Sequence, residues 1–138
     1  STLLWLRVGS GQESIELGKA LYNIINKTSI ETVVNGSTDL THYGSNFSFQ
    51  PMGEGIEAVE WVKNVNDKKI VDQMIEMDCK KVLKSANNNF AACSAGGAVS
   101  AIEFAKLSGV KTGKLIEYAS SYDTVKSESF VGYAGIVF

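Results

Sequence analysis

Residues that commonly build metal and catalytic sites are scarce in this chain of 138 residues. It contains one histidine and two cysteines. A protein metal site normally takes three or four side chains, so the chain cannot form a histidine-rich site by itself. Cys79 and Cys93 fit neither a zinc-binding spacing nor the disulfide framework of a small secreted protein. We therefore expect both thiols to be reduced and the protein to be cytoplasmic.

An excess of positive charge and a long hydrophobic run are lacking as well. The chain has 13 Lys and Arg among 15 Asp and Glu, for a net charge of -2, which argues against a nucleic-acid-binding surface. No apolar run is long enough to cross a bilayer, and the N-terminus lacks the basic-then-apolar pattern of a signal peptide. The first residue is Ser1 rather than Met, so we expect a fragment, a processed chain or a partial chain.

The composition that is present is that of a globular protein, with 44% apolar and 20% charged residues. We treat residues 1–138 as a single domain or half-domain. Residues 3–8 and 30–34 are short apolar runs that predict buried strands, and residues 12–27 between them have helical spacing. This order predicts a βαβ unit with a parallel pair of strands.

The rest of the chain predicts helices followed by two strands. Helices are expected at about 54–64, 66–77, 78–86 and 95–107, with Asn66-Asp67 as the N-cap of the second. Strands are expected at 114–119 and 130–138, as antiparallel neighbours because their connection is too short for a helical crossover. The last strand is almost wholly apolar, which predicts burial on both faces. The fold class is α/β, a mixed β-sheet with flanking helices.

The one histidine, His42, lies in a polar loop after the second expected strand. In open α/β sheets, ligands usually bind at that edge. Asp39 could orient the imidazole, and Cys93 or a nearby Ser or Thr could be a nucleophile activated by it. A single histidine in a polar loop is more often a surface residue or a local hydrogen-bond partner, so both interpretations stay open.

Cys93 precedes the helix expected at 95–107. A helix N-terminus stabilises a thiolate, which suits a metal ligand or a nucleophile. A buried, inert cysteine is the commoner case and the only interpretation for Cys79. The aromatic residues Tyr43, Phe47 and Phe49 either line a pocket or anchor a loop.

Three separated motifs resemble those of the Memo family, also known as AmmeMemoRadiSam system protein B. The family's stretches S-S-D-x-S-H-Y-G, C-G-x-G-P-I, Y-A-T-S-x-D and S-V-V-G-Y-A have counterparts here in the same order. These are Ser37-Thr-Asp-Leu-Thr-His-Tyr-Gly44, Cys93-Ser-Ala-Gly-Gly-Ala98, Tyr118-Ala-Ser-Ser-Tyr-Asp123 and Ser129-Phe-Val-Gly-Tyr-Ala134. The resemblance covers nearly the whole chain. It implies an extradiol-dioxygenase-like (Memo-like) fold of which this chain is the C-terminal half only.

The resemblance also implies a metal-type pocket that is incomplete in this chain. Two histidine ligands would come from the missing N-terminal half, and Cys93 would be the third ligand, holding iron or copper. His42 would serve as an acid/base residue with Asp39 beside it. The resemblance places three further residues in the pocket: Tyr43, Ser120 and Asp123.

Two residues depart from the family pattern. Ser94 stands for the usual Gly and Gly97 for the usual Pro, which alters the turn between Cys93 and the helix. A thiolate in place of the dioxygenase carboxylate also changes the electronics of the metal. Dioxygenase activity therefore does not follow from the fold alone.

Three hypotheses remain. The first is a metal-dependent redox or dioxygenase-like enzyme that needs the missing half. The second is a non-catalytic protein that uses the same pocket to bind a peptide or a small ligand. The third is a truncated module that is stable only with another chain or as a homo-oligomer, because half of an α/β fold exposes a sheet edge or core surface.

Overall fold

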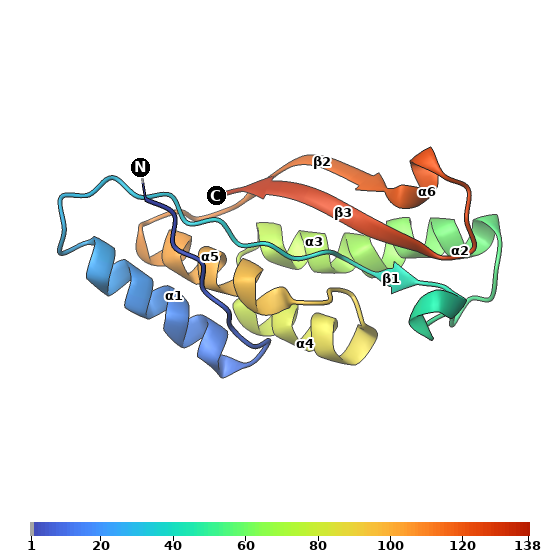
Figure 1. The fold of residues 1–138 in the computed structure, drawn as a ribbon, viewed down its shortest axis with the longest axis horizontal. Coiled ribbons are helices and arrows are strands. Elements are labelled where there is room, and N and C mark those ends of the chain that lie inside the picture. The colour runs from blue at the N-terminus through green and yellow to red at the C-terminus, as the bar shows by residue number, and fades with distance from the viewer. Residues whose placement is uncertain (1) are drawn as a thin grey trace.

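The computed structural model describes residues 2–138, which form a helical layer beside a small antiparallel sheet (Figure 1). The strands are β1 (His42–Tyr43), β2 (Lys114–Ser120) and β3 (Phe130–Val137), in the order β1-β3-β2. The helices are α1 (Gln12–Ile25), α2 (Ile56–Trp61), α3 (Lys68–Ile75), α4 (Cys79–Asn89), α5 (Ala95–Leu107) and the short α6 (Ser121–Thr124). A 3-10 turn, Ser45–Phe47, follows β1. The fold is thus α/β with flanking helices, as expected from the sequence.

Helix α5 is the centre of the helical layer. It packs against α1 and α4, α4 packs against α3, and α3 contacts β2. Small residues allow the closest of these approaches: a Cβ added to Gly18 of α1 would lie 2.6 Å from the Ser100 carbonyl oxygen on α5. The Ser100 hydroxyl donates to the Ser14 carbonyl across the same contact at 2.8 Å. The alternation of small and branched residues along α5 therefore sets the spacing of the layer.

Two clusters of buried side chains form the core. The larger one lies between the helices and includes Ile15, Leu40, Ile70, Val71, Met74, Val82, Val99 and Ile102. The smaller one lies next to β1 and consists of Tyr43, Ala58, Val62 and Phe130. Both clusters include residues of the continuous helical run from α2 to α3. This run therefore packs against the sheet.

A π-helical segment, Val62–Asp67, joins α2 to α3 without a break. The expected N-cap at Asn66-Asp67 is wrong, because Asp67 has helical backbone angles and its side chain caps no N–H group. The wider π turn directs both Asn66 and Asp67 inward, where both are buried. Asn87–Asn89 also continue α4 rather than ending it.

The predicted hairpin of β2 and β3 is confirmed, with pairs from Lys114–Val137 to Ser120–Gly132. Burial of the last strand on both faces is wrong, because only Phe130, Val131 and Gly132 are buried and Val137 is 52% exposed. The helices cover the start of β3, which pairs with β1, and leave the end of β3 exposed to solvent.

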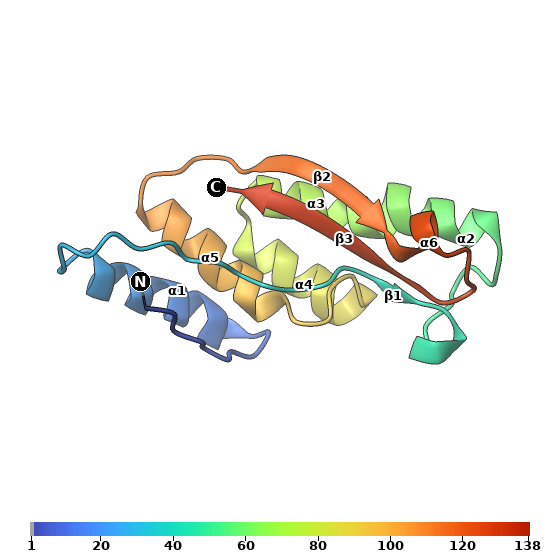
Figure 2. The ribbon, with the colours of Figure 1, turned by 45° about the horizontal axis from the view of Figure 1, so that its top comes forward.

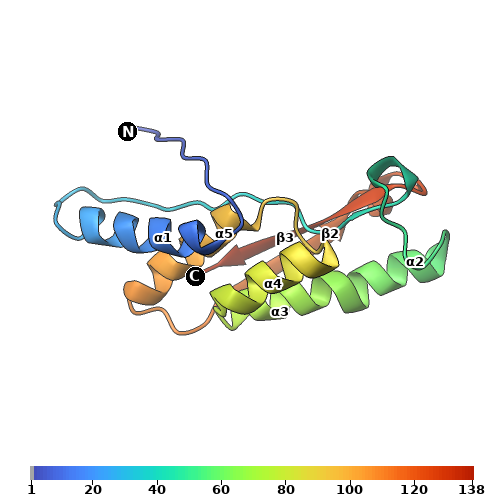
Figure 3. The same cartoon turned by 90° about the horizontal axis from the view of Figure 1, so that it is seen from below.

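The predicted parallel pair is wrong for this chain. Residues 3–8 and 30–34 are extended but form no strand, and within the described residues 2–138 they pair with no neighbour. Figures 1 and 2 show residues 28–41 as a long line leading to β1, and Figure 3 shows the N-terminal segment running away from the helices. Trp5 and Val33 are 83% and 90% exposed. The prediction of buried strands at residues 3–8 and 30–34 is therefore wrong, because an apolar run becomes a strand only when a neighbouring strand pairs with it.

No helix among residues 2–138 is both long and apolar enough to cross a membrane.

Candidate metal and acid–base site

Three side chains with metal-binding atoms converge where the extended segment enters β1. They belong to Asp39, His42 and Cys93, and their ligand atoms all lie within 4.8 Å of one another. Asp39 lies at the end of the extended segment, His42 begins β1, and Cys93 lies in the loop between α4 and α5. The structure thus brings together a histidine, a carboxylate and a thiol that lie up to 54 positions apart in the sequence.

The imidazole of His42 is held from two sides. Its Nε2 lies 3.3 Å from Asp39 Oδ2, and its ring packs edge-on against Phe47 with centroids 4.8 Å apart. The side chains of His42 and Asp39 are 31% and 46% exposed, so solvent and solutes reach the pair. A carboxylate at that distance favours a proton on the facing nitrogen and leaves the other ring nitrogen for a further partner.

Backbone hydrogen bonds fix Cys93 to the same segment. The Cys93 N–H donates to the Asp39 carbonyl at 3.2 Å, and the Ser94 N–H donates to the Thr38 hydroxyl at 3.2 Å. Ser94 is the N-cap of α5, so the thiol side chain lies at the positive end of that helix. The position of Cys93 relative to His42 is therefore set by the backbone and does not depend on a side-chain rotamer alone.

Glycines allow three chain segments to meet at the start of α5. A Cβ on Gly36 would overlap the Gly97 carbonyl oxygen, and one on Gly96 would overlap the Gly9 carbonyl oxygen. The Gly96 N–H donates to the Ser10 hydroxyl at 3.2 Å. Both extended segments thus contact the helix end that carries Cys93.

Three other residues expected in the pocket have structural partners of their own. Tyr43 is fully buried, and its hydroxyl donates to the Gly53 carbonyl and accepts from the Met52 N–H, both at 2.9 Å. Ser120 and Asp123 form a capping box at the start of α6. Asp123 is not one of the three converging groups.

Asp67 is a polar residue next to the site that the sequence did not reveal as such. It is fully buried, and its carboxylate accepts from Thr41, the residue before His42, and from Tyr118. Burial raises the pKa of Asp67, and these donors offset part of that rise. Burial and the charge of Asp67 raise the pKa of Tyr118, so Tyr118 remains a donor. The run of polar residues around Asn66 resembled a helix start, which hid the inward direction of the carboxylate.

Cys79 differs from Cys93 in its burial and in its neighbours. It is buried, and its thiol lies 3.6 Å from Glu103 Oε2. Burial, followed by the charge of Glu103, raises the pKa of the Cys79 thiol to about 11. Cys79 is the inert cysteine that the sequence suggested.

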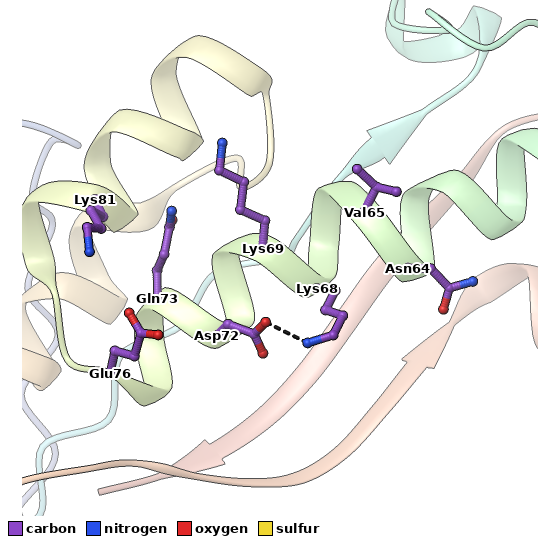
Figure 4. A pocket seen from close by; sticks show the side chains of 8 residues that line it. All are labelled: Asn64, Val65, Lys68, Lys69, Asp72, Gln73, Glu76 and Lys81. Carbon is purple, nitrogen blue, oxygen red and sulfur yellow. Dashed lines mark hydrogen bonds and ion pairs between the residues drawn. The ribbon is translucent and has the colours of Figure 1, made fainter.

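The outer face of the α3 helix has no comparable site. A shallow depression of about 540 Å³ lies there among exposed side chains of both charges (Figure 4). Lys68 pairs with Asp72 at 2.6 Å, and both are about half exposed. Such a solvated i,i+4 pair contributes little to stability.

Comparison with known proteins shows that the chain is similar to Memo-like proteins. The family pattern described as Memo-like protein matches residues 4–137. A MEMO1 family protein of Thermococcus onnurineus is 28% identical over 125 residues, covering 89% of this chain and 43% of its own length. MEMO1 family proteins of Pyrococcus furiosus and Methanopyrus kandleri are 28% and 29% identical, covering 96% and 92% of this chain and 46% and 41% of their own lengths. The chain spans less than half the length of these relatives.

Proposed function

Because the chain belongs to the Memo-like protein family, we propose that it carries one side of a transition-metal pocket with metal-dependent redox or oxygenase-like activity. The convergence of Asp39, His42 and Cys93 within 4.8 Å is the observation that supports this proposal. The likeness of the family to class III extradiol dioxygenases gives the reaction class, and the thiol ligand distinguishes this pocket from theirs.

The donor set fits a first-row transition metal. Cys93 offers a sulfur ligand, whereas His42 and Asp39 stay outside the ligand set. Their side-chain atoms lie within 4.8 Å of the thiol, which places an acid/base pair beside a metal held there. Thiolate and imidazole together favour iron or copper over magnesium or calcium. A complete ligand set would include side chains from outside this chain, as the length of the relatives suggests.

Each residue has a separate task in this proposal. A metal in the pocket would supply a Lewis acid and a redox centre. Cys93 would hold it as a thiolate stabilised by the N-terminus of α5. His42, with Asp39 at 3.3 Å fixing its tautomer, would take or give a proton at its free ring nitrogen. The packing of the Phe47 ring against the imidazole would help to hold the orientation of the ring.

Metal analysis of purified variants tests the proposal. The protein is dialysed against Fe²⁺, Cu⁺ or Co²⁺, and bound metal is measured for wild type, Cys93→Ala and His42→Ala. We expect Cys93→Ala to lower metal affinity by roughly 10- to 100-fold or more. Cys79→Ala is the matched control, since it removes the other thiol far from the converging groups. Equal metal content in wild type and Cys93→Ala would remove the metal pocket.

A non-catalytic binding protein is the second candidate. Phe47 is 40% exposed while it contacts His42, and exposed aromatic rings beside a polar pair suit a peptide or small aromatic ligand. This function predicts ligand binding that survives His42→Ala, weakens in Phe47→Ala and requires no metal. A peptide-library screen on metal-free protein separates it from the first candidate.

The exposed apolar segments support a proposal about partners. Residues 3–6 and 30–33 present Leu3, Leu4, Trp5, Leu6, Ile30 and Val33 to solvent. Unpaired extended chain with apolar side chains is a template for strand pairing. We propose that further polypeptide, of the kind that fills the remaining length of the relatives, pairs with these segments. A second copy of the chain is the alternative occupant. A cytoplasmic location remains a prediction.

Native mass spectrometry over a range of concentrations tests the partner proposal. We expect the chain by itself to associate, and Trp5→Lys with Val33→Lys to reduce that association by placing charge on both edges. Surface Lys63→Glu on the helical side is the control for a change of charge alone. A monomer at every concentration would exclude a second copy of the chain as the occupant and would leave the further polypeptide as the one that remains.

A further inference from the structure

A fully buried carboxylate joins the π segment to the sheet. Asp67 Oδ1 accepts from the Thr41 N–H at 3.0 Å and from the Thr41 hydroxyl at 2.6 Å. Its Oδ2 accepts from the Tyr118 hydroxyl on β2 at 2.8 Å. Every one of these donors is oriented by a strand or by the segment that becomes one, so the carboxylate links the helix to both outer strands of the sheet.

The surroundings leave room for this one side chain and little else. A Cβ on Gly132 of β3 would lie within van der Waals overlap of Asp67 Oδ2, so the strand is open there only because residue 132 is glycine. Asn66, the neighbour of Asp67, donates to the Thr41 hydroxyl at 2.9 Å and to the Asn89 carbonyl at 3.1 Å. Thr41 therefore has a partner for each hydrogen-bonding group of its side chain.

Thr41 is the residue immediately before His42. Its carbonyl accepts from the Gly132 N–H at 3.0 Å, and the preceding Leu40 N–H donates to the Gly132 carbonyl at 2.9 Å. Successive side chains on an extended chain point to opposite faces. A Thr41 side chain fixed toward Asp67 consequently directs His42 the other way, toward Asp39 and Cys93.

From this geometry we infer that Asp67 is a positioning residue for the His42–Asp39 pair. It holds the backbone and the side chain of Thr41 at once and thereby sets the direction in which His42 leaves the strand. The inference rests on the proposed function in one respect: it assumes that the direction of His42 matters for the metal pocket. Asp67 itself touches none of the three converging groups.

The chemistry of the Asp67 side chain supports a role in orienting its neighbours rather than in filling space in the core. An apolar residue would fill the same volume without the cost of burying a carboxylate. Only a carboxylate offers two acceptor oxygens to three donors from two elements. Burial of the Asp67 carboxylate thus costs free energy, and it occurs where the hydrogen bonds of that carboxylate fix the orientation of Thr41.

The experiment compares variants by two readouts in the full chain. The first, which needs no metal, is the nuclear Overhauser contact between the His42 and Phe47 rings, whose centroids are 4.8 Å apart. The second is Co²⁺ affinity, followed by the thiolate-to-cobalt charge-transfer absorption. The variants are Asp67→Asn and Thr41→Val, which disrupt the network, and Thr41→Ser, which keeps the hydroxyl. Met74→Ala is the matched control, because Met74 is a core residue about two turns further along the same helix.

We expect Asp67→Asn and Thr41→Val to weaken the ring contact and to lower Co²⁺ affinity roughly tenfold. Thr41→Ser and Met74→Ala should retain both, although Met74→Ala loses core packing. A wild-type ring contact and wild-type affinity in folded Asp67→Asn and Thr41→Val would overturn the inference.

Two further outcomes are decisive as well. If wild type binds no Co²⁺, this chain by itself does not hold the metal, and the ring contact alone decides the role of Asp67. If Asp67→Asn does not fold, the difference between Thr41→Val and Thr41→Ser decides it, because the two side chains differ in the hydroxyl that bonds to Asp67.

Discussion

The two thiols of this chain show how far the surroundings determine the chemistry of one residue type. Cys93 is exposed at the start of α5, whereas Cys79 is buried beside Glu103, with a pKa raised to about 11. Only a thiolate reacts rapidly with alkylating reagents.

Iodoacetamide should therefore modify Cys93 and leave Cys79 unmodified in the native protein near pH 8. Peptide mass spectrometry after timed quenching measures both sites, and denaturation in urea should make Cys79 as reactive as Cys93. Equal rates in the native state would show that the environment of Cys79 is not closed.

Asp67 predicts a pH dependence of stability whose sign follows from burial. The folded pKa is raised above the ordinary value of 3.8, so the folded state holds the proton at pH values where the unfolded chain has lost it. The contribution of this group to stability is fully present below pH 3.8 and is lost as the pH rises through the folded pKa.

The free energy of unfolding of wild type, minus that of Asp67→Asn, should consequently fall as the pH rises from about 4 toward neutrality. Urea denaturation of both proteins at several pH values measures this difference. Asp78→Asn serves as the control for a partly exposed carboxylate. Its pKa is lowered below 3.8 by its bond to the Lys81 N–H, so its contribution to stability is already complete near pH 4 and should stay constant toward neutrality. A difference independent of pH would contradict the prediction.

The sequence was sufficient to select His42, Asp39 and Cys93, because they lie in motifs whose order and spacing resemble those of the Memo family. Their approach to within 4.8 Å is a property of the fold. Asp67 could not be selected in this way. Its role depends on a π turn, and hydrophobic periodicity carries no signal for one inserted residue in a helix.

At the scale of elements, the sequence predicted helices better than strands. The helix at 95–107 was predicted with the bounds of α5, and the hairpin of β2 and β3 was predicted with its antiparallel sense. Helical periodicity is local and needs no partner. A strand exists only when another pairs with it, so residues 3–8 and 30–34 carried the pattern without becoming strands.

The contact between α1 and α5 gives a prediction in which two effects oppose each other. Gly18→Ala gains about 1 kcal/mol of helix propensity, but its Cβ would lie 2.6 Å from the Ser100 carbonyl oxygen and 2.7 Å from Glu103 Cβ. Overpacking of this kind costs about 1–3 kcal/mol, and backbone atoms cannot move aside easily.

Gly18→Ala should therefore lower the free energy of unfolding by up to about 2 kcal/mol, contrary to the usual effect of this substitution in a helix. Chemical denaturation measures the change. Gly135→Ala on β3 is the control, because nothing lies within 4 Å of the added Cβ there. A stabilised Gly18→Ala variant would show that α1 is free to shift away from α5.

At the scale of the whole molecule, the two extended segments are the least protected part of the fold. Within the described residues 2–138, the backbone N–H groups of residues 3–8 and 31–37 donate no hydrogen bond. Hydrogen exchange of these amides should approach the rate of an unstructured chain, while those of α5 should be slow.

Mass spectrometry of deuterated peptides measures this contrast in the dilute chain. Under conditions where the chain associates or is supplied with its partner polypeptide, the same two segments should become protected, because strand pairing occupies their N–H groups. Slow exchange in the dilute monomer would mean that they are already paired.

Both extended segments lead directly into the metal-type site, one through Ser10 and Gly9 at the start of α5 and the other through Asp39. If the proposed partner binds these segments and a metal binds the candidate site, the two binding events are therefore linked through this shared backbone. If the partner raises the affinity for the metal by some factor, the metal raises the affinity for the partner by the same factor. The two orders of binding reach the same final complex, so their total free energies of binding are equal.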